Sequence, residues 1–264
     1  MATLAGLILP SPWVVGFFLN TALLGIAWGF PKKLLTPTGY LHAWGLGILV
    51  WGALGWQGYV VVMIYFLVGS AVTRVGMARK LSAGIAEGRS GVRGPENVWG
   101  SALVGALCAL ALVVISLELP GRADDSPWPL LIALAYVSSF STKLADTTAS
   151  EVGKAYGKRT FLITTFQAVP PGTEGAVSLE GTLAGLVGAL IMALSGWGVG
   201  LMPPWGIGVC LISAFIATNL ESVIGATLQT KTPWLTNEVV NIVNTAIGAT
   251  LALGLGYGWL QWLA

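Results

Sequence analysis

Long apolar runs alternate with short polar segments along the sequence, and this pattern predicts membrane-spanning helices. A helix needs about 20 mainly apolar residues to cross a hydrocarbon core of about 30 Å. We therefore expect an all-α, polytopic integral membrane protein with seven or eight transmembrane helices. The apolar runs cover residues 12–30, 40–56, 58–77, 98–117, 128–149, 176–196, 205–228 and 238–262.

Composition agrees with this class, because 55% of the residues are hydrophobic and only 9% are charged. An ordinary soluble domain has roughly 25% charged residues. The first run ends at Lys32 and Lys33 without a small-residue cleavage site, so we expect a retained span and not a cleaved signal peptide. Residues 1–264 are predicted to form a single transmembrane catalytic domain.

The distribution of lysine and arginine predicts the topology. Twelve of the thirteen cations fall in the connections on one side of the predicted bundle or at the helix ends beside them, and Arg122 falls on the other side. By the positive-inside rule, these connections face the cytoplasm or its plastid equivalent, and both termini face the opposite side. The net charge of +2 is thus a topology signal, and no nucleic-acid partner is expected.

Polar residues gather at the same predicted face. Each could serve alone as hydrogen-bonding glue between helices, but together they favour a site that takes a polar substrate from the cytosol and a lipid from the bilayer. They are Ser70, Thr73 and Arg74 in the third helix, Lys143, Asp146 and Glu151 in the fifth, Ser178 and Glu180 in the sixth, Asn219 and Glu221 in the seventh, and Asn237, Glu238, Asn241 and Asn244 in the eighth.

The residue types favour a hard cation. Residues 143–154 place their polar members at helical spacing, so these share one stripe. Asp146, Glu151 and Glu221 are the expected ligands of Mg²⁺, which binds a few carboxylates and completes its shell with phosphate oxygens and water. An alternative is that Lys143 and Asp146 form a structural ion pair. The single histidine, His42, is remote, and no nucleophile–histidine arrangement can be assembled.

Two glycine-punctuated segments are candidate phosphate sites. Residues 79–97 combine cations with glycines, which let backbone amides approach an anion, although a flexible positive-inside loop would look similar. Residues 170–185 lead into the sixth helix, whose N-terminus favours anions. The chain has no GxxxxGK[ST] sequence, so a P-loop is excluded. The candidate phosphate ligands are Lys80, Arg89, Arg93, Asn97, Lys154, Thr173, Ser178, Glu180, Gly181 and Thr182.

Residues 146–153 and 170–185 resemble the signature of the transmembrane-protein-19-like family, which includes phytyl-phosphate kinases of plants and cyanobacteria. The resemblance extends to residues 221–226 and 237–245 and covers about residues 60–264. Residues 91–101 resemble the plant and cyanobacterial branch. The DTxA and EGTxAG portions of this sequence are distantly similar to polyprenol and dolichol kinases and to lipid cytidylyltransferases, which use CTP with a divalent metal. This chain departs from the pattern at Glu238, where many members have Asp, and at Gly100 and Ser101, where others have Ala-Asn.

The resemblance implies transfer of a phosphoryl group from CTP, or another nucleoside triphosphate, to phytyl monophosphate. The product would be phytyl diphosphate for tocopherol or phylloquinone synthesis in a cyanobacterial or plastid membrane. Asp146, Lys143 and Glu151 are the expected catalytic residues. Asn219, Asn237, Glu238, Asn241 and Asn244 are expected to orient the substrate.

The acceptor and the class remain open at this point. A phosphate acceptor is already ionised at neutral pH and needs no strong base, whereas a prenol kinase would use Asp146 as the base. A transporter is the alternative of another class, but the sequence has no clear internal repeat, and its polar groups cluster at one face, not at the midplane.

Overall fold

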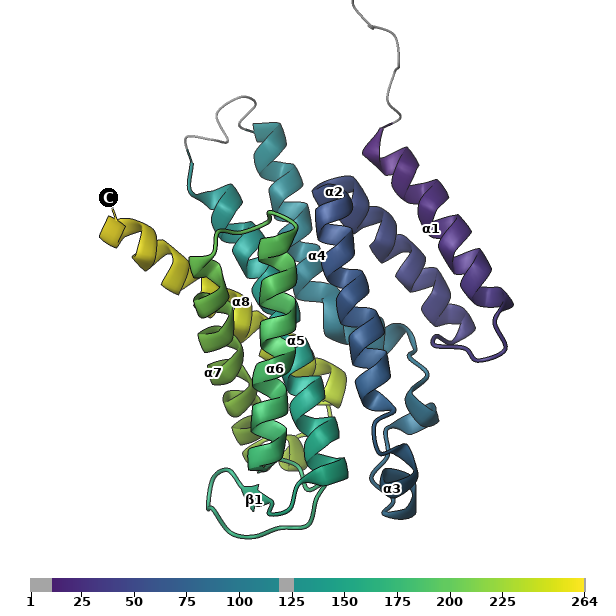
Figure 1. Cartoon of the computed structure of the whole chain (residues 1–264), viewed down its shortest axis with the longest axis vertical. Coiled ribbons are helices and arrows are strands. Elements are labelled where there is room, and N and C mark those ends of the chain that lie inside the picture. The colour runs from purple at the N-terminus through teal and green to yellow at the C-terminus, as the bar shows by residue number, and fades with distance from the viewer. Residues whose placement is uncertain (1–10, 119–125, 264) are drawn as a thin grey trace, which may run out of the picture.

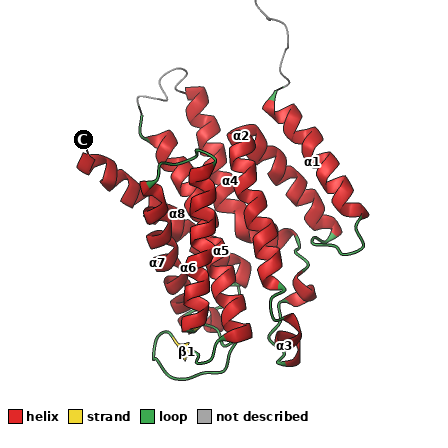
Figure 2. Ribbon diagram, viewed as in Figure 1, coloured by secondary structure: helices red, strands yellow, loops and turns green. Residues whose placement is uncertain are grey.

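The computed structural model describes residues 11–118 and 126–263, and nearly all of it is helical (Figures 1 and 2). The prediction of an all-α integral membrane protein is confirmed. Among the described residues, six helices are long and apolar enough to cross a membrane: α1 (Pro12–Gly29), α2 (Pro37–Thr73), α4 (Pro95–Glu118), α6 (Leu179–Gly198), α7 (Trp205–Thr227) and α8 (Asn237–Leu263). The remaining elements are α3 (Met77–Ser82), α5 (Trp128–Tyr156), the 3₁₀ turns η1 (Gly88–Gly91) and η3 (Gln229–Lys231), and the strands β1 (Phe161–Leu162) and β2 (Ala176–Val177).

The second and third predicted helices are the two arms of α2. As one straight helix, its 37 residues would measure roughly 55 Å at 1.5 Å per residue. The helix is broken at Gly55, which has φ 63° and ψ −157°, a conformation open almost only to glycine. Figure 1 shows the two arms meeting at an angle. The predicted end at residue 77 was wrong, because α2 ends at Thr73 and the left-handed Gly76 separates it from α3.

Helix α5 lies at the centre of the bundle and packs against α2, α4, α6, α7 and α8 (Figure 1). It is more polar than the six apolar spans because its serines and threonines are buried against protein and do not face lipid. The helix continues to Tyr156, beyond the predicted limit of 149. This extension keeps Glu151 and Lys154 on the same helix as Asp146.

The connection between α5 and α6 contains a small hairpin that an all-helical pattern did not predict. Strands β1 and β2 are antiparallel, and Phe161 pairs with Val177. The sixth helix therefore starts at Leu179, three residues later than predicted. Ser178 caps it, and its side chain accepts a hydrogen bond from the Gly181 backbone N–H at 3.1 Å.

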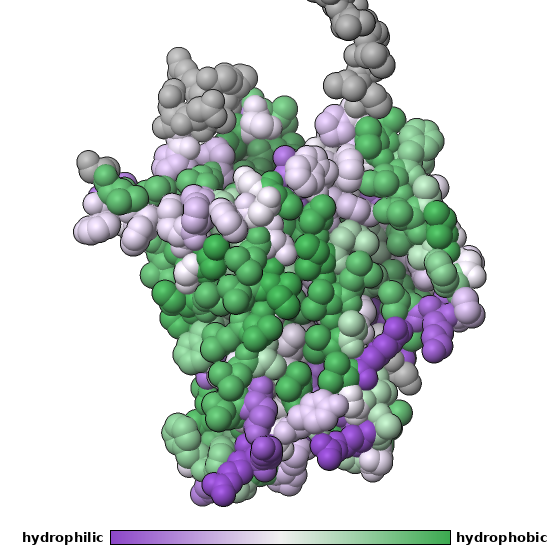
Figure 3. Space-filling model, in the orientation of Figure 1, coloured by the Kyte–Doolittle hydropathy of each residue, from purple (hydrophilic) through white to green (hydrophobic). Residues whose placement is uncertain are grey.

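The described start of α1 and the end of α8 lie toward one end of the molecule, and α3 and β1 lie at the other (Figure 1). In the view of Figure 3, an apolar band covers the middle, and hydrophilic residues gather near the end with α3 and β1. The α1–α2 connection joins this side, because the Arg93 backbone N–H donates to the Leu34 carbonyl at 3.0 Å. Arg122, the cation expected on the opposite side, lies outside the described residues.

Candidate functional site

A polar cavity of about 270 Å³ lies at the end of the bundle that carries α3 and the hairpin. Its walls come from α2, α4, α5, α6, α7, α8 and the connections before α4 and after α5. Six of the chain's eleven acidic residues line it together with three basic ones: Glu87, Asp146, Glu151, Glu174, Glu221 and Glu238, with Arg93, Lys143 and Lys154. The cavity thus gathers charge that would be costly if it faced lipid.

Most of the predicted site residues meet at this cavity. Those that line it are Arg93, Asn97, Lys143, Asp146, Glu151, Lys154, Thr173, Ser178, Gly181, Thr182, Glu221, Asn237, Glu238 and Asn241. The predicted residues that do not line it are Lys80, Arg89, Glu180, Asn219 and Asn244. The convergence of several helices on one face is therefore present, and the five exceptions have identifiable reasons.

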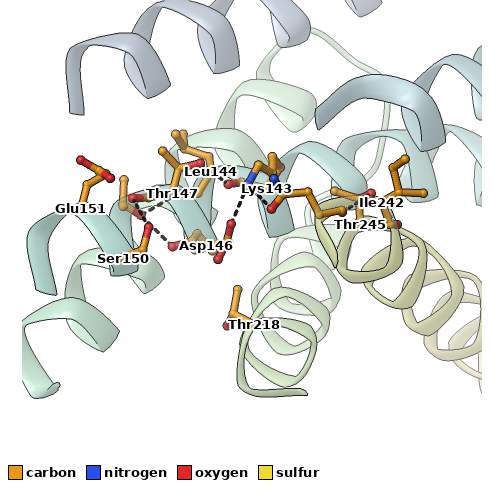
Figure 4. Close-up of polar contacts among 12 residues, drawn as sticks. Lys143, Leu144, Asp146, Thr147, Ser150, Glu151, Thr218, Ile242 and Thr245 are labelled. Carbon is orange, nitrogen blue, oxygen red and sulfur yellow. Dashed lines mark hydrogen bonds and ion pairs between the residues drawn. The ribbon is translucent and has the colours of Figure 1, made fainter. Parts of the chain in front are cut away.

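Lys143 lines the cavity and links α5 to α8; Figure 4 shows its contact with Asp146. Its ammonium donates to Asp146 Oδ2 at 2.6 Å and to Asn241 Oδ1 at 2.7 Å. The side chains of Lys143 and Asp146 are only 8% and 13% exposed. The Lys143–Asp146 ion pair considered from the sequence therefore exists, and the amide of Asn241 holds it in place from the neighbouring helix.

Lys80 is not a cavity cation, which corrects its expected role in nucleotide binding. The side chain is fully buried, and its ammonium pairs with Glu151 and donates to the Thr73 carbonyl at 2.7 Å. Glu151 also lies 3.7 Å from the ammonium of Lys154. Two lysines thus compete with any metal ion for Glu151, and Lys80 instead docks α3 against α5.

Arg93 and Arg89 differ although the sequence treated them alike. Arg93 lines the cavity and is buried, with its guanidinium donating to the Tyr65 hydroxyl at 2.9 Å and lying over the Tyr65 ring. Burial opposes its charge, but Tyr65 and the carboxylates of Glu87 and Glu151 outweigh that effect and raise the pKa of Arg93. Arg89 points away, pairs with Glu96 and donates to Asn97 Oδ1 at 2.9 Å.

The connection between α5 and α6 closes one wall of the cavity through close backbone contacts. Gly175 has φ 75°, and a Cβ there would lie 2.6 Å from the Ser222 carbonyl oxygen on α7. A Cβ on Gly181 would lie 2.6 Å from the Ala149 carbonyl oxygen on α5. Gly175 therefore lets the connection pack closely on α7 beside Thr173 and Glu174, which line the cavity, and Gly181 lets α6 pack closely on α5.

The other three exceptions follow from helix orientation. Glu180 turns outward and accepts a hydrogen bond from the Lys158 backbone N–H at 3.4 Å. Asn219 faces a neighbouring cleft between α6 and α7. Asn244 is fully buried, and neither of its amide atoms has a hydrogen-bond partner among the described residues. An orienting role at the polar cavity is therefore not supported for Asn219 or Asn244.

The expected metal ligands are not assembled as a set. Among the described residues, no group of three or more His, Cys, Asp or Glu side chains is placed to hold a metal ion. Asp146 and Glu221 both line the cavity, and Glu221 is within electrostatic reach of Asp146, Glu174, Lys143 and Lys154. Carboxylate and amide oxygens suit a hard cation that takes the rest of its shell from phosphate and water.

Comparison with known proteins places the chain in a family of integral membrane proteins. Residues 20–249 match the family described as integral membrane protein DUF92. The chain belongs to this family. No solved structure matches the chain significantly.

Relatives of this DUF92 chain occur in cyanobacteria, plants and archaea. It is 63% identical over 247 residues to an uncharacterized membrane protein of Synechocystis, covering 94% of this chain and 92% of that one. It is 45% identical over 221 residues to the chloroplastic protein VTE6 of Arabidopsis thaliana, covering 83% of this chain and 64% of that protein. An uncharacterized membrane protein of Methanocaldococcus jannaschii is 31% identical over 223 residues, covering 84% of this chain and 86% of that one. The predicted kinship with plant and cyanobacterial proteins is confirmed.

Sequence reasoning missed several cavity residues that the DUF92 chain also supplies. Tyr65 lies inside an apolar run and Glu87 in a connection, so neither had a polar neighbour at helical spacing to mark it. Thr218 and Ser222 lie three residues before and one after Glu221. Helical spacing from Glu221 could have identified Thr218.

Proposed function

We propose that this protein is a membrane phosphotransferase that moves the terminal phosphoryl group of CTP, or of another nucleoside triphosphate, to phytyl monophosphate. The product is phytyl diphosphate, for tocopherol or phylloquinone synthesis in a cyanobacterial or plastid membrane. The main support is the cavity at one end of the membrane bundle, which is lined by three cations, six carboxylates and the amides of Asn237 and Asn241. The family relation to plant and cyanobacterial membrane proteins supports the same assignment.

The charge of the cavity lining favours a nucleotide that arrives with a divalent cation. Acidic residues outnumber basic ones in the lining by six to three, so a free triphosphate would meet net repulsion. Asp146 and Glu221 are the residues that would hold Mg²⁺ together with phosphate oxygens, and the bound ion would neutralise charge on the transferring phosphoryl group. Arg93 and Lys154 are the cations available to the remaining phosphate oxygens.

The ion pair between Asp146 and Lys143 favours a phosphate acceptor over an alcohol acceptor. One oxygen of its carboxylate is already occupied by the Lys143 ammonium at 2.6 Å, which suits charge positioning better than proton abstraction. Transfer to a phosphate monoester requires positioning and neutralisation more than a strong base. The same contact argues against the prenol-kinase alternative, in which Asp146 has to accept the hydroxyl proton.

The proposed reaction can be distinguished from its alternatives by which phosphate of CTP is transferred to the lipid. Purified protein in liposomes is given Mg²⁺ and CTP labelled at either the γ or the α phosphate, with phytyl phosphate, phytol or no acceptor. We expect γ-label in phytyl diphosphate and no α-label in any lipid. Incorporation of α-label indicates a cytidylyltransferase, and γ-label in a monophosphate indicates a prenol kinase. Absence of any transfer, with lipid or solute flux in the same vesicles, overturns the proposal in favour of transport.

A further inference from the structure

A second, smaller cavity opens beside the polar one, between α5, α6 and α7. We call it the lateral cleft, and its volume is about 40 Å³. It shares five lining residues with the polar cavity, namely Ala149, Val177, Thr182, Thr218 and Ser222. The two spaces are therefore neighbours across a common wall.

Small residues form the floor of the lateral cleft. Ala145 and Ala189 are buried there, and Gly185 lies so close to α5 that a Cβ on it would be 3.1 Å from the Ala145 carbonyl oxygen. The side walls are larger, with Leu186 on α6 and Phe215 on α7. This arrangement makes a groove that is closed toward α5 and bounded by apolar side chains.

The outer side of the lateral cleft faces the region occupied by lipid chains. The surrounding surface of α6 and α7 carries exposed apolar side chains, including Leu183 at 54%, Val187 at 58% and Phe215 at 45% exposure. Figure 3 shows this apolar surface over α6 and α7. Both helices are long and apolar enough to cross a membrane, so this apolar surface faces bilayer hydrocarbon next to the residues that the cleft shares with the polar cavity.

Three of the polar side chains in the lateral cleft, those on α7, donate hydrogen bonds to carbonyls of their own helix. The Thr218 hydroxyl donates to the Ala214 carbonyl at 2.9 Å, and the Ser222 hydroxyl donates to the Thr218 carbonyl at 3.1 Å. The Asn219 amide donates to the Phe215 carbonyl at 2.7 Å. An apolar chain can therefore lie against them without stripping these donors of their partners, which would be costly.

We propose that the lateral cleft binds the first part of the isoprenoid chain of a lipid phosphate whose head group lies in the polar cavity. This inference rests on the proposed function for the identity of the lipid. The cleft is too small for a whole C20 chain, so the remainder of the chain stays in the bilayer, where each buried CH₂ is favoured by about 0.8 kcal/mol. Selectivity is then exerted on the carbons nearest the phosphate, and Asn219 lines the lipid path.

Photocrosslinking tests this placement without requiring turnover. A phytyl phosphate analogue with a diazirine in its first isoprene unit is incorporated into proteoliposomes without nucleotide, and labelled peptides are mapped by mass spectrometry. We expect label in α6 and α7 that excess unlabelled phytyl phosphate removes. Leu186→Trp, which fills the cleft, should reduce this competed label several-fold, and Val187→Trp on the adjacent lipid-facing position should not.

Asn219→Trp blocks the cleft from α7 and replaces Leu186→Trp if the latter does not give a monodisperse protein in detergent. The label of interest is the part that excess unlabelled phytyl phosphate removes. If this part is spread over all lipid-facing helices, or is equal in the blocking and control variants, the proposal of a lipid site in the lateral cleft is wrong. If wild-type protein shows the competed label in α6 and α7 but no phosphoryl transfer, the proposed reaction fails while the isoprenoid-phosphate site stands. In phosphoryl-transfer assays, the variants that block the cleft should have a KM for the lipid that is raised several-fold and an unchanged KM for the nucleotide.

Discussion

At the scale of single residues, two carboxylates of α5 pair with different lysines and therefore have different roles. Lys80 is fully buried and forms an ion pair with Glu151, whereas Lys143 forms an ion pair with Asp146 in the lining of the cavity. Breaking a buried ion pair by removing one partner is typically destabilising by about 3–5 kcal/mol. Glu151 is therefore tied to the docking of α3, and Asp146 is the carboxylate better placed to act on a ligand.

We expect Asp146→Asn to lower phosphoryl transfer by about 10²-fold or more, because fixed charge aimed at a reacting group commonly contributes this much. The asparagine still accepts a hydrogen bond from Lys143 but leaves this buried ammonium without its counter-charge, so a loss of stability is expected beside the loss of transfer. The measurement is γ-label transfer per mole of protein that elutes as a single species in detergent. Glu96→Gln is the control, since Glu96 is acidic and does not line the cavity. Near wild-type transfer by Asp146→Asn would show that the assignment is wrong.

Arg93 and Arg89 provide a matched pair on one segment. Arg93→Ala should raise the KM for the nucleotide by about tenfold, because a charge-assisted hydrogen bond contributes about 1.5–3 kcal/mol and only Arg93 lines the cavity. Arg89→Ala should change that constant less than twofold. Steady-state kinetics in which the nucleotide and the lipid are varied in turn give a KM for each substrate. If Arg93→Ala raises the KM for the nucleotide and the KM for the lipid equally, Arg93 has a folding role instead. Arg93→Lys shows whether a positive charge alone is sufficient for nucleotide binding.

At the scale of elements, the break in α2 shapes the bundle on the side of α1. The first arm packs against α1, where a Cβ on Gly47 would meet Asn20. The second arm packs against α5, whose Tyr136 hydroxyl donates to the Gly58 carbonyl at 2.7 Å, and its Tyr59 hydroxyl also reaches Asn20 of α1. Because the change of direction occurs at one residue with positive φ, a single substitution at Gly55 should disturb it.

Gly55→Ala should destabilise the protein by about 1–3 kcal/mol, the usual cost of a strained backbone conformation. Gly45→Ala on the same helix is the control, since a Cβ there meets nothing within 4 Å and alanine favours helix by about 1 kcal/mol. Unfolding in detergent with increasing denaturant gives both values. If Gly55→Ala is as stable as Gly45→Ala, the break does not depend on glycine.

At the scale of the whole molecule, the cavity and the positively charged connections lie at the same end. Residues 79–97 contribute Glu87, Arg93 and Asn97 to the cavity, and the α1–α2 connection with Lys32 and Lys33 contacts this segment at Arg93. The positive-inside rule then predicts that the cavity faces the cytoplasm or stroma.

Nucleotide added to sealed proteoliposomes should support transfer only from the side bearing residues 79–97. Protease cleavage of that segment in intact vesicles reports the fraction of each orientation, and detergent permeabilisation gives the total activity. The transfer seen before permeabilisation should match the protease-accessible fraction. Activity that tracks the protected fraction would overturn both the topology and the position of the site.

The sequence by itself determined that the chain is an all-α integral membrane protein and which end of the bundle is polar. Hydropathy is sufficient for the class, because a span needs about 20 mainly apolar residues, but it did not separate the broken α2 from two helices. Helical spacing also placed Lys143, Asp146 and Glu151 on one stripe of α5, and most of the residues predicted for the site do line the cavity.

Only the tertiary structure decided which partner each of these residues meets. Lys143 and Asn241 are 98 positions apart, and Lys80 and Glu151 are 71 apart, so no local pattern could pair them. The rotation of α6, α7 and α8 about their axes turned Glu180, Asn219 and Asn244 away from the polar cavity. Helical periodicity specifies a face, but long-range packing decides what that face contacts.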